Sequence, residues 1–166
     1  MSQKIYSLLQ HLIPELNVQK IPQDTEFYSF SEWLNQQHDF LHYIELKEYY
    51  DNGIEDDFYF NQHNIDTEQL QNEIEVAIAE VFDQYDEEDD EVSFDDQMDA
   101  MQQTEEIIFD KIKLVANQYQ LSLLVIYREN PYWMLVPSQD EQQLNQIVDA
   151  FNDAFNDVGD LNMAVY

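Results

Sequence analysis

Nine carboxylates lie within fourteen residues of the chain, in the stretch 83–96 (DQYDEEDDEVSFDD), and no Lys or Arg lies among them. Dense carboxylate oxygens are ligands that Ca²⁺ takes in proteins. An EF-hand loop needs a Gly at its sixth position and a Glu at its twelfth. A loop beginning at Asp86 has Glu91 and Gln97 there, and other starts within the stretch also lack the Gly. The stretch therefore does not encode an EF-hand, and we expect no dedicated calcium site.

A second candidate for metal chemistry is the pair His38 and His42, with Glu45 three residues further on. Imidazoles four residues apart lie on one face of a helix, and zinc sites use this spacing. The chain has no HExxH motif, no Cys and no obvious further ligand. The alternative is that both histidines pack at a helix boundary beside Trp33 and Tyr43. We therefore predict no metal site here.

Nucleophilic and phosphate-binding motifs are missing from the sequence. The chain has two glycines, Gly53 and Gly159, so GxGxxG and P-loop motifs do not occur, and neither does a GxSxG elbow. The 36 Asp and Glu residues do not by themselves indicate acid–base catalysis, because a catalytic carboxylate needs a pocket that shifts its pKa. We therefore expect neither enzymatic activity nor a cofactor.

Charge is the outlying property of the chain. Six Lys and Arg face 36 acidic residues, which gives a formal net charge of −30. The 63 residues between Lys47 and Lys111 hold 23 carboxylates and no cation. Adaptation to high salt would spread acids evenly and thin the apolar core, whereas here the acids cluster and large apolar residues abound. Such a surface repels nucleic acid and anionic membranes, so we expect a basic protein as partner.

The length and composition indicate a folded chain. Hydrophobic residues make up 44% of its 166 residues, which is enough for a substantial core, and we expect one domain spanning residues 1–166. The absence of Cys is compatible with a reducing compartment. The N-terminal apolar run is too short and too broken for a signal peptide, and no segment resembles a membrane span. We therefore expect a soluble cytoplasmic protein.

Hydrophobic spacing predicts a helical, acidic part over residues 1–92. The predicted helices run from Ser2 to about Leu12, from Ser29 or Ser31 to the Asp51-Asn52-Gly53 stop, and from Asp66 or Thr67 to about Asp86. We expect residues 17–28 and 54–60 to be irregular and residues 87–92 to form a linker.

Residues 93–166 are predicted to fold as α-β-β-α-β. A helix capped by Ser93 precedes two β-rich runs, 121–127 and 132–137, which flank a turn containing Asn130-Pro131. A helix capped by Ser138 or Asp140 and ending near Gly159 then leads to a last strand, 161–166. The first of these helices should turn the following side chains inward: Phe94, Met98, Met101, Ile108, Ile112, Val115 and Tyr119. The fold class is thus α+β, with four to five amphipathic helices on a small antiparallel sheet.

The acids flank and fill the linker between two predicted helices, where they would form a continuous negative field. In size, charge and helical display of acids the chain is similar in kind to acidic nucleic-acid mimics that block DNA-binding proteins, and to immunity proteins that neutralise basic nuclease toxins. This similarity implies a small non-catalytic inhibitor that covers a basic surface of another protein. The predicted partner-binding residues are Glu73, Glu80, Asp86, Glu87, Glu88, Asp89, Asp90, Glu91, Asp95, Asp96 and Asp99.

An alternative hypothesis is a housekeeping protein-interaction module whose acidic face is merely solvated. Its working face would be the C-terminal β-hairpin, with Tyr127, Tyr132 and Trp133 as contact residues. Aromatic side chains anchor many protein interfaces, so this reading has a physical basis as well. The two hypotheses differ in which surface contacts the partner, and a substitution of Trp133 that leaves the fold intact distinguishes them.

Overall fold

The computed structural model describes residues 3–46, 54, 56–86 and 94–166. Within these ranges helices pack on an antiparallel sheet, which confirms the α+β class. The elements are α1 (Gln3–Leu12), the short 3-10 helix η1 (Pro14–Val18), α2 (Phe27–Leu34), β1 (Leu41–Tyr43), α3 (Phe58–Gln62), α4 (Thr67–Asp86), α5 (Phe94–Gln118), β2 (Ser122–Tyr127), β3 (Tyr132–Val136), α6 (Glu141–Phe155) and β4 (Asn162–Val165).

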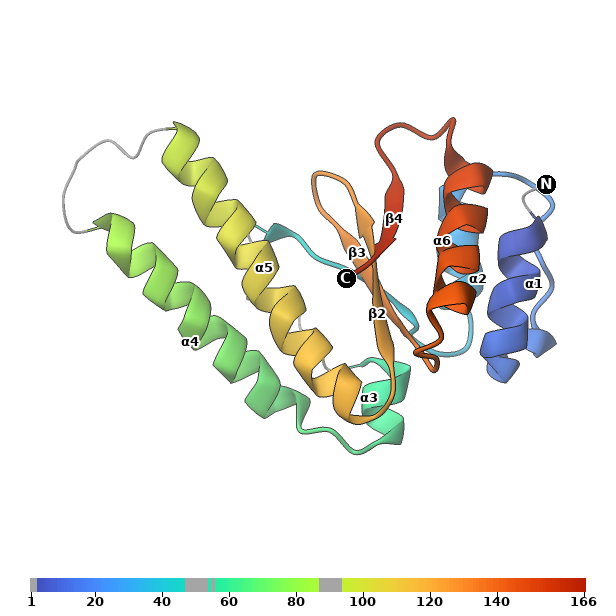
Figure 1. Ribbon diagram of the computed structural model, residues 1–166, viewed down its shortest axis with the longest axis horizontal. Helices are drawn as coiled ribbons and strands as arrows, with labels where there is room; N and C mark the ends of the chain where they lie inside the picture. The colour runs from blue at the N-terminus through green and yellow to red at the C-terminus, as the bar shows by residue number, and fades with distance from the viewer. Residues whose placement is uncertain (1–2, 47–53, 55, 87–93) are drawn as a thin grey trace.

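The sheet lies between two helical layers. Its strand order is β1-β3-β2-β4, with antiparallel pairing throughout. Helix α5 packs on β2 with α4 outside it, whereas α6, α1 and α2 lie on the other side of the sheet (Figure 1). Covering both faces explains why four consecutive residues of β2, Leu123 to Ile126, are buried instead of alternating.

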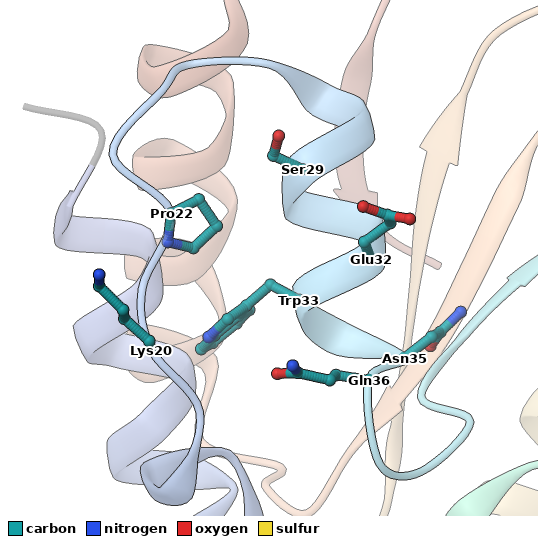
Figure 2. Close-up of a pocket in the computed structure, with 7 residues that line it drawn as sticks. All are labelled: Lys20, Pro22, Ser29, Glu32, Trp33, Asn35 and Gln36. Atoms are coloured by element: carbon teal, nitrogen blue, oxygen red, sulfur yellow. The ribbon is translucent and has the colours of Figure 1, made fainter.

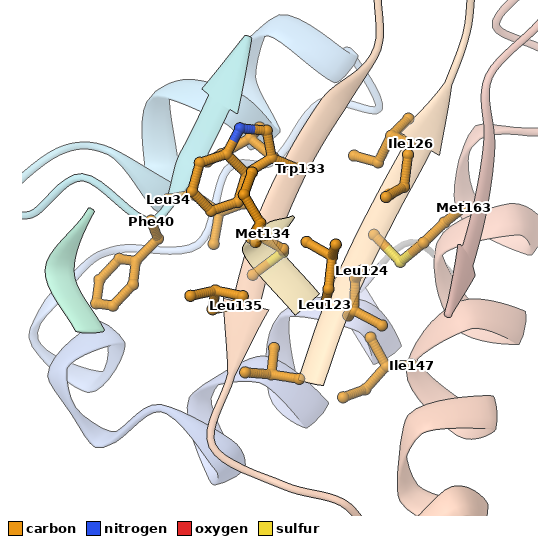
Figure 3. Close-up of a cluster of buried hydrophobic side chains, with 14 of the residues drawn as sticks. Leu34, Phe40, Leu123, Leu124, Ile126, Trp133, Met134, Leu135, Ile147 and Met163 are labelled. Atoms are coloured by element: carbon orange, nitrogen blue, oxygen red, sulfur yellow. The ribbon is translucent and has the colours of Figure 1, made fainter. Parts of the chain in front are cut away.

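The core fills the space on both sides of the central strands. Figure 3 shows Leu124 and Ile126 of β2 close to Met163 of β4. Ile147 of α6 lies beside β2 in the same view. These four side chains are at most 1% exposed. Burying an aliphatic side chain of this size stabilises a fold by about 1.5–3 kcal/mol, so the sheet and α6 hold each other in place.

Local signals in the C-terminal part predict its elements correctly. The α-β-β-α-β order of α5, β2, β3, α6 and β4 is confirmed. Helix α6 begins after Asp140, whose carboxylate accepts a hydrogen bond from the Gln143 N–H at 2.8 Å. Asp66 likewise accepts a hydrogen bond from Gln69 N–H at 2.9 Å before α4. Ser93, the predicted cap of α5, lies outside the described residues.

The predicted helix from Ser29 or Ser31 to the Asp51-Asn52-Gly53 stop is wrong over residues 35–46, and residues 47–53 lie outside the described part. Helix α2 starts earlier, at Phe27, and stops at Leu34. The Asn35 carboxamide then closes a turn, because its Oδ1 accepts hydrogen bonds from Phe40 N–H (3.0 Å) and Leu41 N–H (2.8 Å). The chain continues as β1, where Leu41 pairs with Met134 of β3. The apolar residues after the turn are therefore buried, but they belong to an extended segment and not to a helix.

The segment 54–60, predicted to be irregular, contains the start of α3. Asp57 is its N-cap, and Asp57 Oδ1 accepts a hydrogen bond from Phe60 N–H at 2.9 Å. The other oxygen, Oδ2, lies 2.9 Å from His42 Nε2 on β1. Asp57 is fully buried, so this carboxylate fastens α3 to the edge strand.

The opposite edge strand, β4, is held by a side chain of α6. Asn152 Oδ1 accepts a hydrogen bond from Met163 N–H at 2.8 Å, and Asn152 Nδ2 donates one to Met163 C=O at 3.1 Å. These bonds occupy backbone groups that a sheet edge otherwise offers to another strand. Asn152 therefore both fixes β4 and blunts this edge.

Candidate protein-binding surface

Helices α4 and α5 pack side by side and run in opposite directions, forming the outer layer of the molecule (Figure 1). We call this pair the acidic hairpin. Each helix carries six Asp or Glu residues, against two cations in the pair, Lys111 and Lys113. The exposed carboxylates of the pair are Glu68, Glu73, Glu80, Asp83, Asp95, Asp96, Asp99, Glu106 and Asp110. The hairpin therefore presents a strongly negative surface to solvent.

Five of the predicted partner-binding residues are described, and all five lie exposed on the acidic hairpin: Glu73, Glu80, Asp95, Asp96 and Asp99. Glu73 and Glu80 lie two helical turns apart on α4, and the three aspartates lie in the first two turns of α5. Asp86 is the last residue of α4, and its side chain is outside the described part. Glu87, Glu88, Asp89, Asp90 and Glu91 also fall outside the described residues.

The hairpin's own cations offset little of this charge. Lys111 Nζ lies 4.0 Å from Glu73 Oε2, and both side chains are more than a third exposed. Exposed pairs of this kind stabilise a fold by no more than about 1 kcal/mol and are screened by salt. Lys113 Nζ lies 5.5 Å from the ring centroid of Tyr166. The two lysines therefore leave the acidic hairpin with a strongly negative net charge.

The negative field extends to where α5 meets the sheet. Burial raises the pKa of the Glu105 carboxyl, and the neighbouring Glu106 charge adds to the effect. Burial also raises the pKa of the Tyr166 hydroxyl, which donates a hydrogen bond to Asp110 Oδ1 at 2.9 Å. Both shifts disfavour a further negative charge at a site that already carries several.

The predicted inward face of α5 is right near the sheet and wrong at both ends. Ile108 and Ile112 are buried, and Met101 and Val115 are half-buried. Met98 is 52% exposed, because the first turns of α5 extend beyond the sheet. The other predicted positions are Tyr119, which is exposed after the end of the helix, and Phe94, whose side chain is outside the described part.

The two histidines considered for zinc do not share a helix face. His42 lies on β1, stacked on Trp133 with ring centroids 4.3 Å apart, and its Nε2 meets Asp57. His38 precedes the strand and packs on Phe58, with ring centroids 4.8 Å apart. Among the described residues no group of three His, Cys, Asp or Glu is arranged to hold a metal ion. His42 has a structural role that the sequence did not reveal.

The alternative surface on the C-terminal β-hairpin is mostly internal. Trp133 is 1% exposed, and Tyr127 and Tyr132 are half-buried. Strands β2 and β3 occupy the two central positions of the sheet, with β1 and β4 outside them. Trp133 therefore cannot be a contact residue for a partner in this fold.

A pocket between α2 and the segment before it brings together side chains of mixed character (Figure 2). Figure 2 shows the Trp33 indole reaching from α2 toward the segment that carries Lys20 and Pro22, whereas Glu32 points away from that segment on the same helix. Ser29 Oγ donates a hydrogen bond to Asp24 Oδ2 at 3.0 Å. The hydroxyl is thus paired with a carboxylate from the turn before α2, and the lining does not define a nucleophile with its base.

No protein-family model matches the chain, and searches of curated proteins and of solved structures give no match either. None of the described helices combines the length and the apolar character needed to cross a bilayer. The functional interpretation therefore rests on the surface itself.

Proposed function

We propose that the acidic hairpin binds a basic, nucleic-acid-binding surface of a partner protein and blocks that surface by occupying it. The observation that supports this most is the display of nine exposed carboxylates, against two lysines, on the described parts of two neighbouring helices. The protein acts in this proposal as a small non-catalytic inhibitor in the cytoplasm. Two concrete forms are an immunity protein against a nuclease toxin and a nucleic-acid mimic that counters a defence system.

Helix geometry makes the hairpin a suitable mimic of a charged polymer. Residues three or four positions apart on a helix have Cβ atoms roughly 5–6 Å apart, and seven residues span about 10 Å along the axis. Glu73 and Glu80 have the latter spacing, and Asp95 and Asp99 the former. Duplex DNA also presents regularly spaced charges that basic clefts neutralise with Lys and Arg. A rigid row of carboxylates competes for the same cations.

Electrostatic attraction also favours fast association. Complementary charge raises association rates by roughly ten- to a thousandfold, and salt reverses the gain. A formal charge of −30 on 166 residues is large enough to steer a basic protein toward the hairpin before contact. The partner's affinity should therefore fall steeply as the salt concentration rises.

The test compares two variants with the same net charge. The first neutralises the hairpin at four exposed positions, Glu73→Gln, Glu80→Gln, Asp95→Asn and Asp99→Asn. The control neutralises four exposed acids in or just after α6: Glu141→Gln, Asp149→Asn, Asp153→Asn and Asp157→Asn. The probes are a nuclease-toxin domain and a histone-like DNA-packaging protein, with binding followed by fluorescence anisotropy at two salt concentrations.

We expect the hairpin variant to lose at least tenfold in affinity, while the α6 control stays within about threefold of the wild type. If only the net charge of the protein mattered, both variants would lose the same affinity. Equal losses of affinity would therefore refute a specific role for the hairpin. Absence of binding to either basic protein at low salt would contradict the proposal itself.

A further inference from the structure

One flank of the acidic hairpin is hollowed into a groove of about 460 Å³ between α4 and α5. The α4 side chains that line it recur every three or four residues from Gln69 to Glu80, so they form one helix face. Lys111 contributes from α5. At about 1.5 Å per residue this face is roughly 16 Å long, which is three helical turns.

The groove combines apolar and acidic side chains. Val76 lies in the middle of its lining and is 61% exposed, and the half-buried Ala77 lies next to it. Leu114 is not part of the lining, but it lies one helical turn beyond Lys111 on α5 and is 62% exposed. Glu73 and Glu80 lie one turn to either side of Val76 and are both exposed. An apolar centre thus lies between two carboxylates.

Two helices packed side by side leave a groove that fits a third helix. An amphipathic helix laid in such a groove buries its apolar side chains at spacings of three and four. Val76 and Leu114 are large aliphatic residues exposed to solvent, so a partner's apolar stripe would remove them from water. The length of the groove matches about three turns of such a helix.

The charge of the groove restricts the occupant further. Glu73 and Glu80 flank its centre within a chain of net charge −30, so a second copy of this chain would be repelled. Nucleic acid and anionic membranes are repelled for the same reason. An amphipathic helix with Lys or Arg beside its apolar stripe fits both features. Its cations lie near Glu73 and Glu80, and its apolar side chains are buried at the centre of the groove.

We propose that this groove binds an amphipathic helix with basic flanks, supplied by the partner protein. The proposal rests on the proposed function, since it names the element of the basic partner that the hairpin recognises. It adds an apolar contact to an interaction that charge alone would leave unspecific. The groove, and not the linker, then selects the partner.

The test uses two synthetic peptides of 18 residues with identical Leu and Lys composition. In the first, Leu recurs at helical spacings of three and four, and in the second the Leu positions are scrambled. The protein variants are Val76→Gln with Leu114→Gln, and a control, Phe82→Gln with Met98→Gln. The control residues are 44% and 52% exposed apolar side chains on the same two helices, and neither lines the groove or lies one helical turn from a residue that does. Neither pair changes the charge.

The wild type should bind the amphipathic peptide at least tenfold more tightly than the scrambled peptide at 150 mM salt. The groove variant should lose that preference, and the control should keep it. Equal binding of both peptides, with no effect of the groove substitutions, would overturn the groove proposal and leave the electrostatic function standing. Loss of the preference in the control as well would also overturn it. Failure of the function is read separately, from the four-charge variants and the basic proteins described above.

Discussion

Replacing Asp57 with Ala should lower the free energy of unfolding by about 2–5 kcal/mol. Two losses contribute. Removing an N-cap carboxylate destabilises a helix by about 0.5–2 kcal/mol, and here the cap accepts from Phe60 N–H. Removing the partner of His42 breaks a hydrogen bond to a charged group, worth about 1.5–3 kcal/mol. Proteins are stable by only about 5–15 kcal/mol, so this change is large.

The assay is urea unfolding followed by circular dichroism, with the midpoint and slope fitted for each variant. Asp57→Asn keeps an oxygen for Phe60 N–H and loses the charge beside His42, so we expect about half of the loss seen with Ala. The exposed neighbour Asp56 is the matched control, and Asp56→Ala should shift stability by no more than about 0.5 kcal/mol. If Asp57→Ala proved as stable as Asp56→Ala, the carboxylate would not fasten α3 to β1.

Two further predictions concern β4 and α5. Asn152→Ala should destabilise the protein by about 1–3 kcal/mol, because it leaves both backbone groups of Met163 without their partner, and faster amide exchange at Met163 would check this. An unchanged amide exchange rate at Met163 would mean that β4 does not depend on the hydrogen bonds from Asn152. Glu105→Gln should be more stable than the wild type at pH 7, because burial raises the pKa of Glu105 in the folded state above its ordinary value of 4.5. The folded wild type then binds more protons and loses stability as the pH rises from about 4.5 through that raised value, so the gain should vanish below pH 4, and urea midpoints at pH 4 and 7 measure it. A gain of the same size at both pH values would point to packing instead of charge.

Long periodic patterns and local caps predicted most of the fold. Helix α4 follows from its spacing of three and four, and the cap of α6 is Asp140, one of the two residues, Ser138 and Asp140, that the sequence offers. The β2–β3 hairpin follows from two β-rich runs around a short turn. Each of these elements is specified by residues close together in the chain.

The end of α2 could not be predicted in this way. The residues Phe40, Leu41 and Ile44 suit a helical stripe as well as an extended segment buried against a sheet. What decides is the pairing of Leu41 with Met134, more than ninety residues away, together with the turn closed by Asn35. The spacing of apolar residues along the chain predicts neither the strand pairing nor the turn.

The sequence predicted only part of the candidate site, because some of its features depend on how the helices pack together. Seven-residue spacing placed Glu73 and Glu80 on the exposed face of α4, and both are exposed. The exposure of Met98 and Leu114 depends on where the sheet ends beneath α5 and on the position of α4, which no pattern along one helix reveals. The groove beside Val76 is likewise a product of two helices together.

The most direct test of the central claim is competition with duplex DNA for one basic partner. The hairpin is proposed to occupy the partner's nucleic-acid-binding surface, so DNA and this protein should exclude each other. With the nuclease-toxin domain held constant, the apparent dissociation constant of the protein should rise in proportion to the DNA concentration. A complex that contains all three components, with the affinity unchanged by DNA, would contradict the account.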